Sequence, residues 1–210
     1  MDIKIVSVNA MSEGNEVFLT VVISNGEGRS EKKKLLIFAE QYLELKLSRG
    51  SVIDESTFDT IEEMSRQCRA LKKGSELLSY SASSERRLAQ RLVSKGIDKE
   101  SAAFAASSLK RMGAINEALD VEGAVKTCLK KLWGKKRIYR ELCAKGYERE
   151  YIVSALDEVE PEAFEQNCVL LLKKKYKTVP TEPAEQKKII ASLVRYGYSF
   201  SEIKKAMQNQ

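Results

Sequence analysis

The clearest pattern in the chain is a helical stripe of apolar residues that ends at a glycine and occurs three times. The glycines, Gly96, Gly146 and Gly197, are 50 and 51 residues apart. Because glycine takes the left-handed cap conformation without steric cost, each copy predicts a helix, a corner and a second helix. A period near 50 residues indicates a helical repeat protein. The matching positions eight and four residues before the glycine and six and nine after it are Leu88, Leu92, Ala102 and Ala105, then Ile138, Leu142, Ile152 and Ala155, then Ile189, Leu193, Ile203 and Ala206.

The N-terminal part has a different pattern. Residues 2–38 alternate apolar and polar positions and are rich in β-branched residues, which predicts a meander of about three strands. Its predicted turns are Met11–Gly14 and Ser24–Gly28. A short helix over Phe38–Leu47 and a longer one from Asp54 to about Tyr80 follow, although Gly74 weakens the longer helix.

These patterns predict a mainly α protein with tandem three-helix repeats and a small N-terminal β-containing segment. The serine-rich stretch 79–84 marks the boundary between the two parts. Pro180 and Pro183 place a loop at Tyr176–Pro183. The predicted segments are a β-meander with a short helix at 1–50, a linking helix at 51–83, and repeats at 84–133, 134–179 and 180–210.

The charge is concentrated in the repeats. The whole chain carries a formal charge of +6, but residues 84–210 hold 25 lysines and arginines against 17 acids. This excess suits a polyanion or an acidic protein groove as partner. Solvated helix faces rich in lysine explain the same excess equally well.

Little in the sequence indicates chemistry. The chain has no histidine, no phosphate-binding glycine loop, and four scattered cysteines, Cys68, Cys128, Cys143 and Cys168. Reduced core cysteines are the main interpretation, and a zinc site is the alternative, although no ligand spacing supports it. We therefore expect no enzyme activity, no cofactor and no metal. With no long apolar run and no signal-peptide pattern at the N-terminus, we also expect no membrane span and a cytoplasmic location.

Binding is the remaining function, and the basic residues are its candidates. Several stand at the expected starts of the repeat helices, where positive charge opposes the helix dipole, so a negative partner would explain them. Aromatic residues such as Trp133 lie among them and could stack on bases, although packing between helices is the more frequent role. The candidates for contact with a partner or nucleic acid are Arg86, Arg87, Lys130, Lys131, Lys135, Lys136, Arg137, Arg140, Lys173, Lys174, Lys175, Lys187 and Lys188.

The repeats resemble the RecX family, the regulatory proteins of the recombinase RecA. The resemblance rests on GKKRIYRELCAKGYEREYIVSAL at 134–156, on LKRMGAINEALDVEGAV just before it, and on the final segment from KKKYKTVP onward. It covers about residues 80–210. One departure is the turn at 113–117, Gly-Ala-Ile-Asn-Glu, which lacks an aromatic residue that is usual in the family.

The resemblance implies a non-enzymatic modulator of RecA. Family members are elongated, curved arrays of three-helix repeats that bind along the groove of the RecA–DNA filament. They lower its ATPase, recombination and coprotease activities, and they can contact DNA. For this chain the resemblance therefore implies a RecA filament as partner, with single- or double-stranded DNA bound more weakly or through the filament, and we expect a monomer. Two alternatives remain open, a nucleic-acid-binding repeat protein independent of RecA and a protein-binding helical scaffold.

Overall fold

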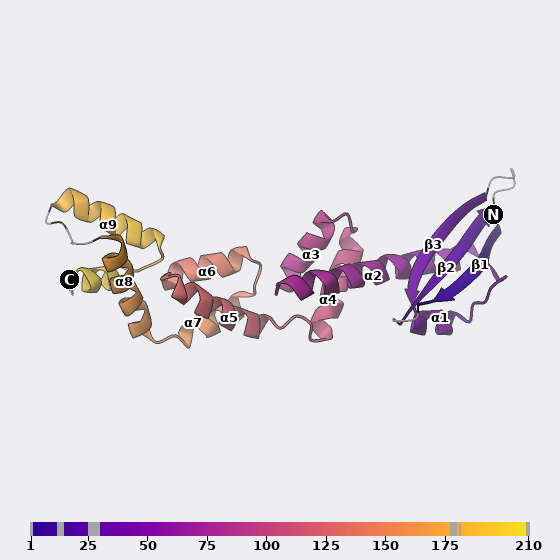
Figure 1. Cartoon of the computed structure of the whole chain (residues 1–210), viewed down its shortest axis with the longest axis horizontal. Helices are drawn as coiled ribbons and strands as arrows, with labels where there is room; N and C mark the ends of the chain where they lie inside the picture. The colour runs from indigo at the N-terminus through magenta and orange to yellow at the C-terminus, as the bar shows by residue number, and fades with distance from the viewer. Residues whose placement is uncertain (1, 12–14, 25–29, 177–179, 181, 209–210) are drawn as a thin grey trace. The chain divides into compact units, whose positions relative to one another are not determined.

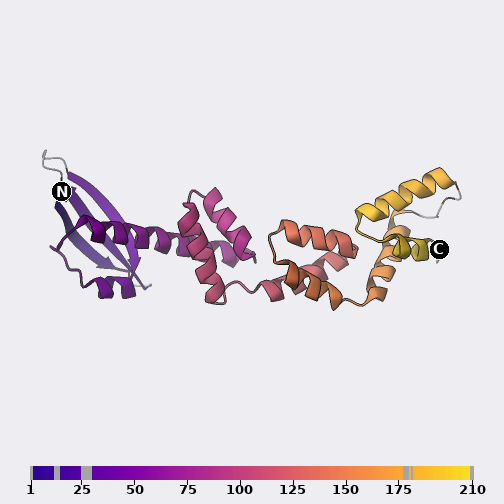
Figure 2. The ribbon, with the colours of Figure 1, turned by 180° about the vertical axis from the view of Figure 1, so that it is seen from behind.

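The computed structural model describes the chain except residues 1, 12–14, 25–29, 177–179, 181 and 209–210. The turns predicted at Met11–Gly14 and Ser24–Gly28 and part of the predicted loop at Tyr176–Pro183 lie outside the described residues. The predicted fold class, mainly α with a small N-terminal β segment, is confirmed (Figure 1; seen from behind in Figure 2). The chain forms two compact units, Met1–Ser81 with Leu88–Ala114, and Ala82–Arg87 with Ile115–Gln210.

The first unit begins with a four-stranded antiparallel sheet in the order β3-β2-β1-β4. Its strands are β1 (Asp2–Ala10), β2 (Glu16–Ser24), β3 (Ser30–Phe38) and β4 (Val52–Ile53). Alternate side chains such as Ile3, Leu19 and Ile37 point to one face and are buried there. The helices α1 (Ala39–Leu45) and α2 (Glu55–Tyr80) supply residues that complete this core, including Phe58 and Ile61 from α2. The sheet is therefore stabilised by its helical cover, as a small sheet must be.

The fourth strand was not predicted from the sequence. Val52 and Ile53 pair with Lys4 and Ile3 of β1, at one edge of the sheet. Two residues are too few to show an alternating pattern, so the sequence predicted them as part of the linking helix segment at 51–83.

The opposite edge of the sheet, β3, is covered by α2. The backbone N–H of Leu36 donates to Ser65 Oγ at 2.9 Å, and the Arg69 guanidinium donates to the Lys34 carbonyl at 2.8 Å. These are backbone groups of an edge strand, with which no further strand pairs in the part of the chain that the structure describes. The side chains of α2 thus satisfy polar groups that an edge strand otherwise exposes.

The second half of α2 packs against α3 (Glu85–Ser94) and α4 (Lys99–Arg111). Gly74 does not interrupt α2, and side chains of α3 and α4 lie close to it. A Cβ built there would lie 2.6 Å from a methyl carbon of Leu109, with Leu88 and Leu92 also within 4 Å. The glycine that weakened the helix prediction therefore leaves room for the Leu109 side chain, which would have to shift to accommodate a methyl group.

The second unit contains two further trios of helices, each with its own apolar cluster. The first trio is α5 (Glu117–Lys130), α6 (Lys135–Ala144) and α7 (Arg149–Asp157), and the second is α8 (Pro161–Lys175), α9 (Pro183–Arg195) and α10 (Phe200–Gln208). Each trio begins one helix earlier than the 50-residue sequence segments do. A 50-residue period gives the spacing between repeats but not the residue at which a repeat begins. The predicted segments and these packing trios therefore divide the same series of helices at different points.

Each trio contains one of the three predicted glycine corners, and the left-handed conformation is confirmed at all of them. Gly96, Gly146 and Gly197 have φ of 88°, 82° and 97°. After each glycine, the next residue's N–H donates to the carbonyl of the leucine four residues before the glycine, at 3.2 to 3.3 Å. This is the Schellman bond that ends a helix. The repeat seen in the sequence is therefore a repeat of backbone geometry.

Two of the corners receive the start of an earlier helix. At the first, Ser84 Oγ donates to the Lys145 carbonyl at 2.8 Å, and a Cβ on Gly146 would lie 3.0 Å from that oxygen. At the second, the Lys136 N–H donates to the Gly197 carbonyl at 3.2 Å. A helix start has free N–H groups and a helix end has free carbonyls. The second joint pairs the two directly, and at the first the Ser84 hydroxyl bridges them, because it also accepts from the Arg87 N–H at 3.2 Å.

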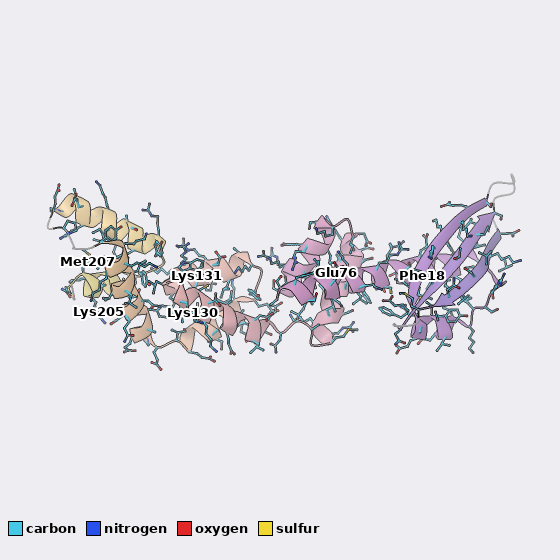
Figure 3. All side chains as sticks on the ribbon, viewed as in Figure 1. Phe18, Glu76, Lys130, Lys131, Lys205 and Met207 are labelled. Atoms are coloured by element: carbon cyan, nitrogen blue, oxygen red, sulfur yellow. The ribbon has the colours of Figure 1, made fainter. Side chains whose placement is uncertain are left out.

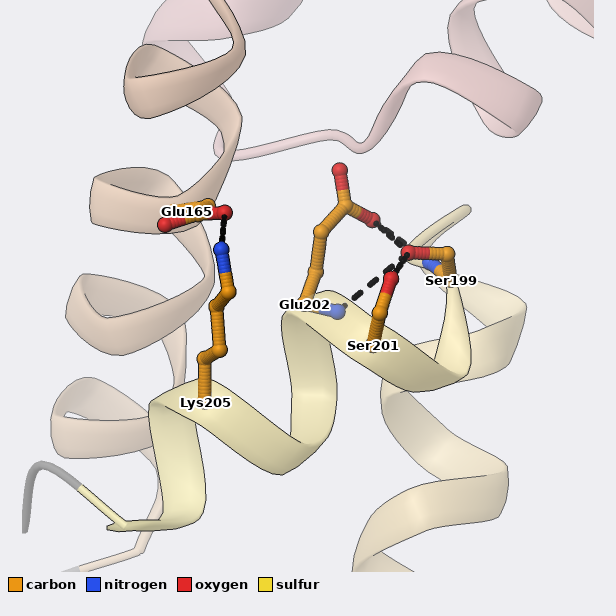
Figure 4. A network of polar contacts seen from close by, with 5 residues as sticks. All are labelled: Glu165, Ser199, Ser201, Glu202 and Lys205. Carbon is orange, nitrogen blue, oxygen red and sulfur yellow. Dashed lines mark hydrogen bonds and ion pairs between the residues drawn. The ribbon is translucent and has the colours of Figure 1, made fainter.

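The last helix is fixed by a capping box and an ion pair (Figure 4). The Ser199 hydroxyl accepts from the Glu202 N–H at 3.3 Å, and the Glu202 carboxylate accepts from the Ser199 N–H at 2.6 Å. Lys205 forms an ion pair with Glu165 of α8. This reciprocal arrangement defines where α10 begins and holds it on α8.

Candidate functional site

All the predicted basic residues belong to the second unit. Arg137 is half-buried and the others are exposed. Lys130 and Lys131 mark the end of α5 (Figure 3). The structure brings six of the predicted residues into two local groups, each of which includes residues of α6, and leaves the rest apart from them.

The first group is a cation–aromatic cluster made of Lys131, Trp133, Arg137, Lys175 and Tyr196. The Arg137 guanidinium carbon lies 4.2 Å from the Trp133 ring centre and 4.9 Å from the Tyr196 ring centre. Lys175 Nζ lies 4.2 Å from the Tyr196 ring centre, and Lys131 Nζ lies 5.3 Å from that of Trp133. Cations at these distances are attracted by the ring quadrupole.

This cluster changes the interpretation of the aromatic residues. Ring surface of Trp133 and Tyr196 is occupied by Arg137 and Lys175, so it is not open to a stacked base. The packing role that the sequence favoured for Trp133 is the observed one. The cations of the cluster can still meet phosphate or carboxylate oxygens at its exposed side, where Lys131 and Lys175 lie.

The second group lines a hollow of about 690 Å³, which we call the basic hollow. It lies between α6, α7 and α9. Its apolar surface combines side chains of all three helices, and cations surround that surface. The described lining residues are Lys135, Lys136, Tyr139, Arg140, Val153, Leu156, Asp157, Val194 and Arg195. Three of the predicted residues, Lys135, Lys136 and Arg140, therefore share one site.

The other predicted residues do not join either group. Lys173 and Lys174 stand in the last turn of α8, where positive charge suits the helix dipole without any partner. Lys187 and Lys188 were expected at a helix start, which is wrong, because α9 begins at Pro183 and they lie in its second turn. Lys130 ends α5, and Arg86 and Arg87 are in the first turn of α3.

The cost of positive charge at the start of α6 has a local compensation. The Gly134 N–H donates to the Tyr196 carbonyl at 2.8 Å and the Lys136 N–H to the Gly197 carbonyl, so the helix start faces the carbonyl end of α9. Lys135 also pairs with Asp157 at 2.7 Å. The dipole argument for a negative partner is therefore weaker at α6 than the sequence suggested.

Sequence reasoning missed Tyr196 and Arg195 as members of these groups. Tyr196 immediately precedes the corner glycine, as Lys145 and Lys95 do in the other copies. Comparing that position between copies would have singled out the aromatic residue. Arg195 gave no such signal, because its role depends on α9 lying beside α6 and α7.

The cysteines have the environment of core residues. Cys68, Cys128 and Cys168 are buried, Cys143 is half-buried, and all four are free thiols. Burial raises the pKa of the Cys68 thiol to about 11 and that of Cys168 to about 12. Over the described residues, no group of three or more histidine, cysteine or acidic side chains gathers as a metal site would require.

No helix in the described part of the chain has the length and apolar character needed to cross a membrane.

Comparison with known proteins identifies relatives of this architecture. No known family model matches the chain. A protein of Clostridioides difficile (strain 630) named Regulatory protein RecX is 27% identical over 180 residues, which is 84% of each chain. A protein of the same name from Caldanaerobacter subterraneus subsp. tengcongensis is 26% identical over 169 residues, covering 80% of this chain and 84% of the relative.

Solved structures agree with these relatives. A crystal structure of regulatory protein RecX superposes with a TM-score of 0.77 at 20% identity, covering 99% of this chain and all of that one. That of RecX from Lactobacillus salivarius has a TM-score of 0.60 at 22% identity, covering 69% of this chain and 96% of that one. At these identities the structures show a common fold. Together with the sequence relatives, they confirm the resemblance to the RecX family.

Proposed function

We propose that this chain, whose likeness to RecX proteins extends over most of its length, is a regulator of the recombinase RecA. In this proposal it binds in the groove of the RecA–DNA filament and inhibits the ATPase, strand-exchange and coprotease activities. The partner is the filament, and DNA is contacted more weakly or as part of it. The observation that carries the proposal is the match to a protein named Regulatory protein RecX over 84% of both chains.

The surface of the second unit supports an anionic partner. Lys135, Lys136 and Arg140 share the basic hollow, and Lys131 and Lys175 extend from the cation–aromatic cluster. Cations on a fixed helical frame suit the phosphates and carboxylates that a nucleoprotein filament presents. Because a filament repeats, separate weak contacts on one molecule can act together and raise the affinity.

The decisive experiment measures RecA ATPase on single-stranded DNA while the protein is titrated in at well below one molecule per RecA. We expect the rate to fall at these ratios. The fall should persist when single-stranded DNA is in large excess over RecA, because the target is the filament rather than free DNA. An unchanged rate at equimolar protein would overturn the proposal.

Two other outcomes would identify the alternatives. Binding to DNA without any effect on RecA, with affinity that falls steeply with salt, would indicate a general nucleic-acid-binding protein. Absence of DNA binding together with a salt-insensitive protein partner would indicate a helical scaffold.

A further inference from the structure

The basic hollow has an apolar floor that the proposed contact with phosphates does not use. Val153 of α7 and Val194 of α9 are 45% and 37% exposed, although both are aliphatic. Leu156, almost fully buried, and the half-buried Tyr139 continue the floor beneath and beside them. Aliphatic side chains exposed together in a concavity indicate a place where another apolar group is received.

The rim of the hollow is strongly positive. Lys136 and Arg140 are one turn apart on α6, and Arg195 stands at the end of α9. Asp157 is the one acid among the described lining residues, and Lys135 neutralises it at 2.7 Å. Three cations therefore remain around the floor without an acid among the described lining residues to balance them.

We infer that the basic hollow binds a peptide segment that carries apolar side chains flanked by carboxylates. The apolar side chains rest on Val153 and Val194, and the carboxylates meet Lys136, Arg140 and Arg195. An acidic amphipathic helix is the form of peptide that satisfies both features, because its apolar side chains share one face. The inference rests on the proposed function, because it assumes that the bound peptide belongs to a protein surface of the RecA filament.

The floor favours a peptide over a nucleic acid. Single-stranded nucleic acid is held by aromatic platforms together with a charged groove. In the hollow the floor is mostly aliphatic and Tyr139 is the aromatic contributor among the described lining residues. A bound phosphate backbone would leave the two exposed valines without an apolar partner, whereas a leucine side chain would cover them.

The test uses fluorescence anisotropy with the full chain and a defined probe. The probe is a fluorescein-labelled synthetic helix that carries leucines at i, i+3 and i+4 and glutamates at the flanking positions. Three comparison probes are a scrambled peptide of the same composition, a peptide with lysine in place of glutamate, and labelled oligothymidylate. Saturable binding of the first peptide, at least tenfold tighter than that of the scrambled and lysine peptides, is expected.

Variants separate the floor from the rim. The double variant Val153→Ser/Val194→Ser should weaken peptide binding about tenfold, because it removes apolar surface worth roughly one factor of ten. It should leave oligothymidylate binding unchanged. Arg140→Glu should weaken both. Lys126→Glu, an exposed residue of α5 that does not line the hollow, makes the same charge change and should affect peptide binding little. Thermal unfolding checks that each variant is folded.

Each outcome decides the inference. Peptide binding no tighter than that of the scrambled control overturns it, and so does a floor variant that binds the peptide normally. Oligothymidylate binding that is lost in the floor variant would identify the hollow as a nucleic-acid site instead. The RecA ATPase assay on the wild-type protein is run in parallel. If RecA is inhibited but the peptide does not bind, the inference fails while the proposed function stands. If the peptide binds but RecA is not inhibited, the proposed function fails while the peptide site in the hollow stands.

Discussion

Gly134 lies directly against Gly197, so that a Cβ on Gly134 would be 2.5 Å from the Gly197 carbonyl carbon. The start of α6 and the corner after α9 therefore meet through backbone, without intervening side chains. A Cβ on Gly197 would likewise be 2.3 Å from the backbone nitrogen of Arg137. This contact holds together α6 and α9, two of the three helices that border the basic hollow, so the geometry of the candidate site depends on it.

Gly134→Ala should destabilise the second unit by about 1–3 kcal/mol, because backbone atoms cannot retreat from the added methyl group as a flexible side chain can. The φ of Gly134 is −80°, which alanine adopts freely, so the cost comes from the contact. Guanidinium unfolding followed by Trp133 fluorescence measures it, since Trp133 is the only tryptophan.

The matched control is Gly123→Ala in α5, where an added Cβ meets nothing within 4 Å. It should raise stability by about 0.5–1 kcal/mol, because alanine favours the helix over glycine. Equal effects of the two substitutions would contradict the contact between Gly134 and Gly197.

Lys136 and Arg137, both predicted from the sequence as contacts with a partner, should respond differently to charge reversal. Lys136 is exposed on the rim of the hollow, so Lys136→Glu should weaken binding to the RecA filament several-fold without changing stability. Co-sedimentation with RecA filaments on single-stranded DNA measures this. Wild-type affinity in a folded Lys136→Glu protein would remove the hollow from the interface.

Arg137→Glu should instead destabilise the second unit by about 1–2 kcal/mol, because the guanidinium contacts two aromatic rings. The emission of Trp133 should change as well, since the cation at 4.2 Å from its ring is lost. Arg137→Lys, which retains the charge, should recover part of the stability. A variant with wild-type stability and emission would show that this contact contributes nothing.

Native thiol reactivity should single out Cys143. It is half-buried, whereas burial raises the pKa of the Cys68 and Cys168 thiols to about 11 and about 12. Because the thiolate is the reactive form, iodoacetamide at pH 8 should label Cys143 first and the three buried cysteines, Cys68, Cys128 and Cys168, only after unfolding. Peptide mass spectrometry reports the order. Comparable labelling of Cys68 or Cys168 in the native protein would contradict their buried environment.

The helix cap at Asp98 should give a stability contribution that depends on pH. Its carboxylate accepts from the Ser101 N–H at 2.8 Å, and this backbone hydrogen bond lowers the pKa of Asp98 below its ordinary 3.8. The contribution is therefore present above pH 3.8 and is lost as the pH falls through the lower folded value. Asp98→Ala should cost about 1 kcal/mol at neutral pH.

Circular dichroism melts across pH check this prediction. The difference in melting temperature between wild type and Asp98→Ala should stay constant around neutral pH and become smaller in acid. Asp98→Asn retains an acceptor and should lose less at neutral pH than alanine does. A difference that persists unchanged in strong acid would show that the carboxylate charge plays no part in the cap.

The repeat architecture was predictable because local rules determine it. The glycine corners, the apolar stripes around Leu92 and Leu142, and the cap at Asp98 all depend on residues close in sequence. The β4 strand and the packing role of Gly74 depend on segments far apart in sequence, so no local pattern revealed them.

The candidate site was predictable in composition but not in arrangement. The sequence identified the basic residues of α6, but helical spacing does not divide them, because Arg137 and Arg140 are three residues apart and lie on neighbouring positions of the helix. What divides their roles is the approach of α9, which brings Tyr196 to one group and Arg195 to the other. That approach depends on the contact between Gly134 and Gly197. Because glycine has no side chain, no pattern of residue types in the sequence indicates this contact.

The attachment of α2 to the sheet edge affects how copies of this protein meet. Ser65 and Arg69 already occupy the Leu36 N–H and the Lys34 carbonyl of β3, so a strand from another molecule would first have to displace a helix. At the other edge, β4 pairs with Ile3 and Lys4 of the nine-residue strand β1. Addition of a strand from another molecule is therefore opposed most directly at the β3 edge, where a helix already occupies the backbone groups that fibril growth would use.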